Sequence, residues 1–481
     1  MQAYLRKRGR MAGRQGFKAH DLALQCDGLQ AGDCHGVFLE GNQGGGRVPG
    51  REGFYARARL PNTARERRMR RMKTDVVVLG AGIVGVSTAL HLVARGRSVV
   101  LLDRRGPGEE TSYGNAGLIE RASVIPYAFP RDWRSLWRYA RNNTPDVSYH
   151  PRYLPRIAPW LLRYWWHSAP RRLARAAEAM LPLIERSVAE HDALKDEAGI
   201  ARLFRRNGWL DGVRSEAGLA RAIAEAQALA PYGLNYRVLD REALTAVEPS
   251  LSRMAGAIHW LDPVNVSDPG AVTRGYAALF QRRAGVLARG DARSLKPSGK
   301  AWQVQGEEGM IEARDVVVAL GPWTPDVLRP LGYRIPMAVK RGYHQHYALE
   351  EGAALSHPVA DIESGFVVTP MTLGVRLTTG AEFAARDAPP SPVQIQRARA
   401  LAGQLLPLGA AVESEPWMGC RPCMPDMRPV IGPAPRHHGL WLAFGHAHHG
   451  FTLGPVTGKL LASMITGQAP DIDPAPYRVG R

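Results

Sequence analysis

Cysteine is scarce in this chain of 481 residues: there are four, Cys26, Cys34, Cys420 and Cys423. Four cysteines are too few for a disulfide framework in a chain of this length. Cys420 and Cys423 form a C-x-x-C pair, which in isolation would suggest a redox couple or half of a metal site. Because no second such pair accompanies them, we expect two buried free thiols and no bound metal.

Long apolar runs are also missing. No stretch reaches the roughly eighteen apolar residues that a membrane-spanning helix needs. The basic segment Met1–Arg10 is not followed by the apolar core of a secretory signal. We therefore expect a cytoplasmic protein, with peripheral contact to the inner face of the cytoplasmic membrane left open.

Acidic residues are outnumbered, and the formal net charge is +19. Residues 1–71 contain 15 Lys/Arg and 6 Asp/Glu, which accounts for +9 of this excess. This segment is rich in Gly and Arg and has no hydrophobic periodicity, so we expect a basic, disordered leader rather than a nucleic-acid-binding surface. The rest of the chain has the composition of a globular protein, and the length allows two domains.

A dinucleotide-binding unit begins near Thr74. The apolar run Asp75–Leu79 predicts a buried parallel strand, Gly80–Gly85 reads G-x-G-x-x-G, and a helix and a second buried strand follow. The first glycine permits the tight turn, the second lets the backbone approach a pyrophosphate, and the third lets helix and strand pack closely. Asp103 ends the second strand, where an acidic residue accepts hydrogen bonds from a ribose.

Further elements suggest a second, interleaved domain. A buried strand is expected at 313–320, a series of antiparallel strands at 333–385 and a helix at 264–284. We predict an α/β protein in which a Rossmann-type domain is interleaved with an antiparallel-sheet substrate domain. The expected segments are 72–122, 252–332 and 424–481 for the first domain, and 123–251 and 333–423 for the second.

The segment Glu110–Ile119, which follows Asp103, reads ETSYGNAGLI. With this segment the chain resembles the FAD-dependent D-amino-acid oxidase family, and most closely its bacterial D-amino-acid dehydrogenases. The resemblance runs from about residue 73 to residue 468. Four further stretches contribute to it, in the family's order: Val316–Trp323, Lys340–Tyr343, the G-x-R-P-x-x-P-D stretch Gly419–Gly432, and the glycine-rich loop Gly445–Gly454.

The G-x-G-x-x-G unit and the resemblance together imply an FAD site. Its expected residues are Gly80, Gly82, Ile83, Val84, Gly85, Asp103, Arg104, Thr111, Ser112, Asn115, Ala116, Gly117, Leu118, Ala292, Gly321, Trp323, Gly445, His446, Gly450, Phe451, Thr452 and Leu453. Related sarcosine oxidases attach their flavin to a cysteine close to this stretch, but that position corresponds to Gly419 here. We therefore expect FAD to be bound non-covalently.

For the substrate, the resemblance assigns the carboxylate to Arg421, whose planar fork can form two parallel hydrogen bonds. The alternative is a structural pair between Arg421 and Asp426. Tyr343 and His344 are further candidates for the substrate pocket. Neighbouring residues of a strand face opposite sides, and the sequence does not tell which side is the pocket.

The resulting functional prediction is oxidative deamination of D-amino acids. Hydride leaves Cα for the flavin, the imine is hydrolysed to a keto acid and ammonia, and the electrons pass to a quinone or to O2. Orientation provides much of the acceleration, so no dedicated general base is required. The alternatives are a secondary or small amino acid as substrate (hydroxyproline, proline, sarcosine or glycine), or a nicotinamide-dependent dehydrogenase.

Overall fold

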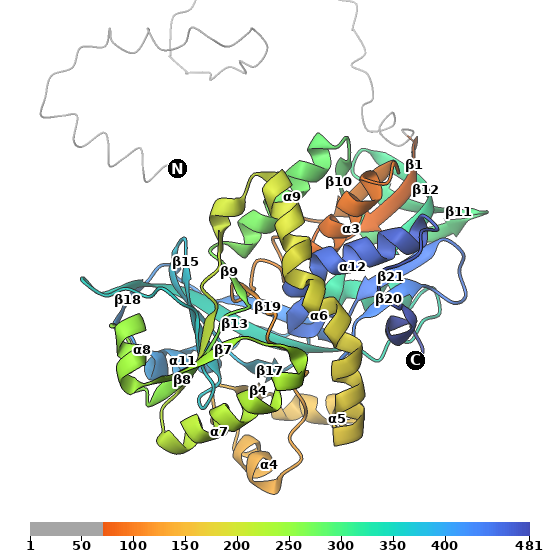
Figure 1. Cartoon of the computed structure of the whole chain (residues 1–481). Coiled ribbons are helices and arrows are strands. Elements are labelled where there is room, and N and C mark those ends of the chain that lie inside the picture. Colours follow the sequence, from red (N-terminus) through yellow and green to blue (C-terminus); the bar gives the residue numbers. More distant parts are fainter. Residues whose placement is uncertain (1–70) are drawn as a thin grey trace, which may run out of the picture. The chain divides into compact units, whose positions relative to one another are not determined.

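The computed structural model describes residues 71–481, and the predicted leader, except Arg71, lies outside the described residues (Figure 1). The first strand, β1 (Arg71–Leu79), starts slightly earlier than the expected Thr74. Within residues 71–481 no helix has the length and apolar character that crossing a membrane requires.

A seven-stranded sheet carries the dinucleotide unit. Its order is β1-β2-β10-β11-β12-β21-β20, and β1 additionally pairs in parallel with β12. The other strands are β2 (Val99–Asp103), β10 (Val286–Ser298), β11 (Ala301–Gly306), β12 (Gly309–Val318), β20 (Val430–Pro433) and β21 (Leu440–Phe444). The predicted strand–turn–helix–strand unit is thus confirmed, with α3 (Ile83–Val93) as its helix.

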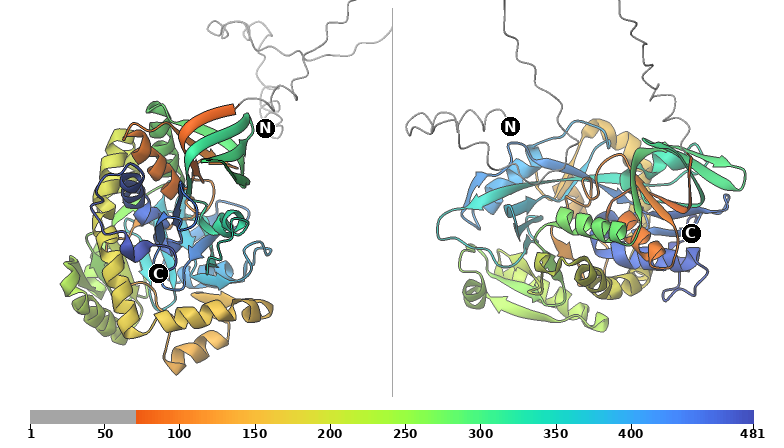
Figure 2. Two further views of the ribbon diagram at one scale, coloured as in Figure 1. Left: turned by 90° about the vertical axis from the view of Figure 1, so that its right-hand side faces the viewer. Right: turned by 90° about the horizontal axis from the view of Figure 1, so that it is seen from above.

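Both faces of this sheet are buried, as the apolar run in β1 predicts. Val76 and Val78 point into an apolar cluster with α3, whereas Val77 and Leu79 point into a second cluster on the other face. Helices α6 (Pro170–Ala198), α9 (Pro269–Arg282) and α12 (Gly450–Ile465) complete the layer on the α3 side (Figure 2).

An eleven-stranded, mainly antiparallel sheet forms the second part. Its order is β4-β17-β13-β16-β15-β14-β6-β8-β7, and β18 and β19 pair with β13. The bounds are β4 (Val147–Tyr149), β6 (Trp209–Val213), β7 (Tyr236–Asp240), β8 (Gly256–Trp260), β13 (Ala338–Leu349), β14 (Val359–Asp361), β15 (Phe366–Met371), β16 (Gly374–Thr378), β17 (Ala381–Phe383), β18 (Leu408–Ala411) and β19 (Trp417–Cys423). The strands expected between 333 and 385 are therefore present.

Smaller elements connect the two sheets. A three-stranded sheet contains β3 (Leu118–Ile119), β5 (Phe204–Arg205) and β9 (Val264–Val266). The remaining α-helices are α4 (Trp133–Ala140), α5 (Leu154–His167), α7 (Glu216–Ala228), α8 (Arg241–Val247), α10 (Thr324–Leu328) and α11 (Val393–Ala402). α4 and α5 lie next to each other at one end of the described part (Figure 1).

The structure departs from the expected segments in two places. β8, expected in the dinucleotide domain, pairs with β6 and β7 in the large sheet. α6, expected in the substrate domain, packs against α9 and α12 beside the dinucleotide unit. The helix expected at 264–284 is also divided: Val264–Val266 is strand β9, and the helix starts at Pro269 because Asp268 caps it through the Ala271 amide.

Candidate active site

One cavity of about 1110 Å³ is lined by residues from both large sheets. Its volume is at the upper end of the range for cofactor and ligand sites. It is lined by most of the expected FAD residues: Gly80, Gly82, Ile83, Val84, Asp103, Arg104, Thr111, Ser112, Asn115, Ala116, Leu118, Ala292, Gly321, Trp323, His446, Gly450 and Phe451.

The other expected FAD residues lie behind this lining: Gly85, Gly117, Gly445, Thr452 and Leu453. A Cβ on Gly85 would lie 1.8 Å from the Gly80 carbonyl oxygen, so this glycine allows the close packing of helix and strand. The Thr452 hydroxyl accepts a hydrogen bond from the Glu120 amide at 3.1 Å, and Leu453 is part of the apolar core. These residues support the cavity wall.

The glycine turn has the geometry that a dinucleotide requires. Gly80 has φ +106°, and a Cβ there would lie 2.4 Å from the Ala319 carbonyl oxygen. Two side chains hold the turn from outside: Asp103 Oδ2 accepts from the Ala81 amide at 2.6 Å, and Ser112 Oγ accepts from the Ile83 amide at 2.9 Å. Gly82 is the N-cap of α3 and lines the cavity, so the positive end of this helix lies at the cavity wall.

The wall beside this turn fits the adenosine half of FAD. The Arg104 guanidinium lies 4.2 Å from the centre of the Trp323 ring and pairs with Glu110 at 2.6 Å. These residues follow β2 and β12, and their planar groups suit stacking and hydrogen bonding to a nucleoside. The residues present therefore fit the cofactor that the sequence predicts.

The loop before α12 forms the other end of the cavity. The backbone of His446 bridges to Cys423 at the end of β19, and its Nε2 lies 3.0 Å from Thr457 Oγ1. Burial lowers the pKa of His446 to about 3, so this imidazole is neutral. Cys420 and Cys423 are both buried free thiols, as expected.

Arg421 is on β19 and lines the cavity. Its guanidinium donates to three backbone carbonyls: Gly380 at 2.6 Å, Thr379 at 3.2 Å and, weakly, Arg341 at 3.5 Å. Of the five N–H groups of an arginine, two are therefore left for a ligand. A glycine makes this position possible, since a Cβ on Gly342 would lie 2.6 Å from Arg421 Nη1 and Nη2.

The structural alternative for Arg421 is wrong. Asp426 pairs with Arg428 at 3.0 Å and with Arg481 at 2.8 Å. Arg421 instead depends on neutral carbonyls, which position its charge without neutralising it. This leaves the positive charge for an anionic ligand.

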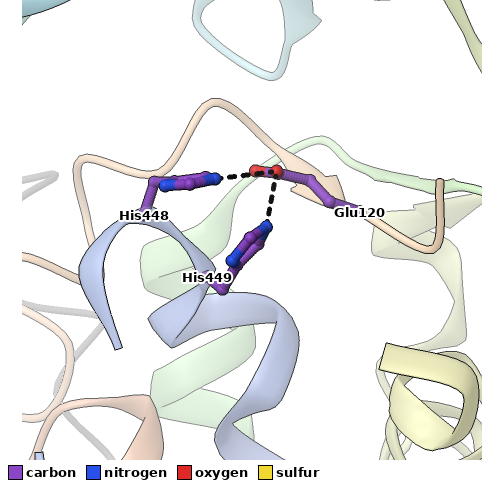
Figure 3. Close-up of side chains that lie close together, drawn as sticks. All are labelled: Glu120, His448 and His449. Carbon is purple, nitrogen blue, oxygen red and sulfur yellow. Dashed lines mark ion pairs between the residues drawn. The ribbon is translucent and has the colours of Figure 1, made fainter. Parts of the chain in front are cut away.

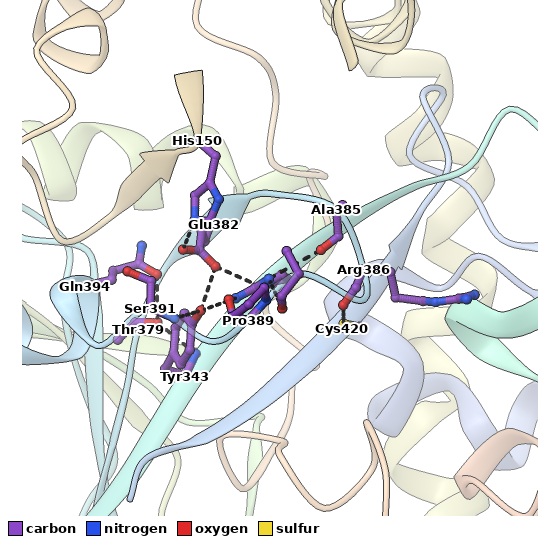
Figure 4. Close-up of polar contacts among 12 residues, drawn as sticks. His150, Tyr343, Thr379, Glu382, Ala385, Arg386, Pro389, Ser391, Gln394 and Cys420 are labelled. Atoms are coloured by element: carbon purple, nitrogen blue, oxygen red, sulfur yellow. Dashed lines mark hydrogen bonds and ion pairs between the residues drawn. The ribbon is translucent and has the colours of Figure 1, made fainter. Parts of the chain in front are cut away.

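Tyr343 does not offer its hydroxyl to the cavity. The hydroxyl donates to Glu382 at 2.7 Å and accepts from the Arg341 side chain at 2.6 Å and from the Ser391 amide at 2.9 Å (Figure 4). Its single proton is thus already in use, inside a network around the buried Arg341–Glu382 ion pair. Tyr343 lines the cavity but has no free polar group for a substrate.

His344, in contrast to Tyr343, does not line the cavity. Its ring stacks on Trp417 at 4.8 Å between ring centres and meets Tyr113 at 5.4 Å, and these aromatic rings cover it. Trp417 lines the cavity and His344 does not. Two effects lower the pKa of His344 well below its usual value: burial is the larger, and the positive charge of the nearby Arg376 is the smaller. The sequence left open which face of this strand meets the pocket; in the structure Tyr343 lines the cavity, whereas His344 packs against Trp417 and Tyr113.

The sequence reading missed Glu120 as a cavity residue. It follows β3, directly after the predicted flavin segment, and its carboxylate faces His448 and His449 (Figure 3). The Oε2 atom lies 3.8 Å from His448 Nε2 and 3.5 Å from His449 Nε2. Burial raises the pKa of Glu120 to about 8 and lowers that of His449 to about 4. The only sequence signal was the position of this acid next to a recognised motif.

Comparison with known proteins identifies the family. The family model "FAD dependent oxidoreductase" (DAO) matches residues 75–464. A D-amino acid dehydrogenase of Chromohalobacter salexigens is 30% identical over 85% of this chain and 99% of its own length, and a D-amino-acid oxidase of Bradyrhizobium diazoefficiens is 30% identical over 84% and 97%. The glycine oxidase structure from Geobacillus kaustophilus has the same fold, with a TM-score of 0.65, 19% identity, and coverage of 85% and 99%.

The chain belongs to the DAO family of FAD-dependent oxidoreductases. It is an FAD-dependent amino-acid oxidoreductase, which confirms the predicted cofactor over the nicotinamide alternative.

Proposed function

We propose that the protein deaminates D-amino acids oxidatively. The observation that supports this most strongly is Arg421: a half-buried arginine in the cavity wall, positioned by three carbonyls and retaining free N–H donors. Such a fork binds a carboxylate and sets its direction. The names of the two relatives at 30% identity support the D configuration.

Bound FAD supplies the two-electron acceptor for hydride from Cα. The chain's own residues then bind, orient and shield the substrate. Arg421 fixes the carboxylate, and Tyr127, Phe129 and Tyr164 provide apolar and aromatic wall around it. Fixing one end of a small substrate against a shaped wall aligns its Cα–H bond, which is the main demand of this chemistry.

A substrate panel tests the proposal. Anaerobic flavin reduction by D-amino acids, their L-enantiomers, glycine, sarcosine, proline and hydroxyproline should be fastest with a D-amino acid. Faster reduction by sarcosine or a proline derivative would replace the proposal with the secondary-amine alternative. Repeating the assay with a dye acceptor, in air and without oxygen, separates an oxidase from a dehydrogenase.

We also propose that FAD is held without a covalent bond. Gly419, at the position where the related sarcosine oxidases carry their cysteine, lines the cavity and offers no side chain. Acid precipitation should therefore release all the yellow colour into the supernatant. Colour retained in the pellet would contradict this.

For electron transfer we propose a membrane quinone as acceptor, reached by peripheral contact through α4 and α5. These helices expose four tryptophans: Trp133, Trp137, Trp165 and Trp166. The arginines Arg131 and Arg172 lie over two of these rings, at 4.1 and 3.7 Å. Exposed tryptophans beside basic residues are typical of surfaces that bind the headgroup region of anionic membranes.

Co-sedimentation with vesicles tests this surface. The protein should bind vesicles with anionic lipid more strongly than neutral ones. Trp133→Ala combined with Trp137→Ala should weaken that binding and leave dye-coupled activity unchanged. Equal binding of the variant and the wild type would remove α4 from the proposal.

A further inference from the structure

The cavity contains a carboxylate with no charged partner of its own. Glu120 lies within 3.8 Å of two imidazole nitrogens, and burial lowers the pKa of both His448 and His449, so neither can neutralise it. Among the described residues, Nε2 of each histidine is buried and has no hydrogen-bond partner. Three polar groups thus converge on one place without satisfying one another, which marks a site for an additional cationic or hydrogen-bonding group.

Arg421 provides the complementary charge. Arg421 and Glu120 both line the cavity, and each shifts the pKa of the other through the attraction of opposite charges. An α-amino acid in neutral solution is a zwitterion with a carboxylate and an ammonium group on the same carbon. Arg421 and the ionised form of Glu120 match that pair of charges.

We propose that Glu120, flanked by His448 and His449, receives the amino group of the substrate and takes its proton. This rests on the proposed function and adds a residue to it. The step is balanced: one N–H bond of the ammonium breaks, one O–H bond forms on Glu120, and the opposite charges become a neutral amine and a neutral acid. The neutral amine has the lone pair that assists hydride loss from Cα.

With a pKa of about 8, Glu120 is mostly protonated at neutral pH in the absence of substrate, and its base form predominates only at higher pH. The positive charge of a bound ammonium group favours the ionised form, which is the form that takes the proton. The groups that act on Glu120 come from four segments and include both signs: His448 and His449 before α12, Arg421 on β19, Asp211 on β6, and Ser123 and Tyr127 after β3. This proposal is an alternative to the expectation that no dedicated base is required.

A metal ion is the competing occupant. Two histidines and a glutamate form a known zinc-ligand set. However, a metal-binding histidine normally donates its second ring N–H to a carboxylate or carbonyl. Among residues 71–481, no such hydrogen bond is made by His448 or His449, whose rings instead lie against each other at 3.8 Å between centres.

The test compares Glu120→Gln with the wild-type holoenzyme. Glu185→Gln is the matched control, because Glu185 is half-exposed and pairs only with Arg121 outside the cavity. FAD content and melting temperature confirm folding. Stopped-flow flavin reduction with D-alanine, or with the fastest amino acid of the panel, gives kcat/KM from low to high pH. Propionate has a carboxylate but no amino group, so its binding to the holoenzyme with oxidised flavin reports the Arg421 contact alone.

In Glu120→Gln, kcat/KM at neutral pH should fall by about 100-fold and recover as pH rises through the pKa of the free amino group. Propionate affinity should stay within about twofold, and Glu185→Gln should match the wild type. A profile of Glu120→Gln equal to that of the wild type would overturn the inference and leave the proposed function standing. If none of the amino acids in the panel reduced the flavin of the wild-type enzyme, both the inference and the proposed function would be overturned.

Metal analysis closes the remaining possibility. The holoenzyme should contain no stoichiometric metal, and dialysis against EDTA should leave its rate unchanged. One equivalent of Zn²⁺ in the wild type that is lost in both Glu120→Gln and His449→Asn would show a metal site instead, and would overturn the proposal.

Discussion

The two ends of the cavity are formed by different kinds of chemical group. At the dinucleotide end, the decisive groups are backbone: the Gly80 turn, the amides at the start of α3, and the close packing at Gly85. At the proposed substrate end, the groups to which we assign substrate binding are charged side chains, Arg421 and Glu120, which lie on a strand and a loop from distant parts of the chain. We therefore expect added bulk to disturb the first end most, and a change of charge or direction to disturb the second.

The largest expected effect is at the dinucleotide end. Gly82→Val should abolish FAD binding, because the new side chain would occupy the space where backbone amides meet the pyrophosphate. The flavin-to-protein absorbance ratio of the purified variant measures this. Ala94→Val introduces the same side chain at the exposed far end of α3 and should retain FAD. Full flavin content in Gly82→Val would place the cofactor elsewhere.

At the substrate end, Arg421→Lys should lower kcat/KM for amino acids by about 100-fold, since lysine lacks the planar fork. Gly342→Ala should have a similar effect from a neighbouring strand, because its Cβ would lie 2.6 Å from the guanidinium nitrogens. FAD content should be normal in both variants. Amines without a carboxylate should react equally poorly with wild type and variants.

This contrast also explains what could be predicted from the sequence. The glycine turn, Asp103 and Ser112 lie within one short βαβ stretch, where local pattern determines the geometry. Which face of β13 meets the cavity depends instead on the pairing of β13 with β19 and on α11, and these contacts are remote in sequence. The pattern therefore suggested Tyr343 and His344, whereas the polar groups that converge in the cavity are Arg421 and Glu120.

A smaller effect is expected for Tyr343 and His344, the two other residues that the sequence suggested for the substrate pocket. Tyr343→Phe removes a hydroxyl with three partners beside the buried Arg341–Glu382 pair, so it should cost about 1–3 kcal/mol of stability. Because the hydroxyl does not face the substrate, kcat/KM should change by less than about twofold. His344→Phe, which keeps the stacking on Trp417, should also retain activity. Thermal unfolding and steady-state assays of both variants provide the measurement. A 100-fold loss of activity at unchanged melting temperature would show that the substituted residue takes part in the reaction after all.

The smallest expected effect is on the pH dependence of thermal stability. It tells whether Glu120, without substrate, is a buried acid with a raised pKa or one partner of an ordinary ion pair. Burial raises the pKa of Glu120 from 4.5 to about 8, so the folded protein binds this proton more tightly than the unfolded chain does. The stabilisation from that proton is fully present below about pH 4.5 and is lost progressively as pH rises to about 8. Gln at this position stays neutral at every pH. The melting temperature of Glu120→Gln minus that of the wild-type holoenzyme, both without substrate, should therefore increase with pH across this window and level off above it.

If Glu120 instead formed an ion pair with a protonated His449, its pKa would be depressed, and the variant would be the less stable protein at neutral pH. A melting-temperature difference that is independent of pH would contradict the raised pKa, and Glu185→Gln, outside the cavity, provides the baseline for that comparison.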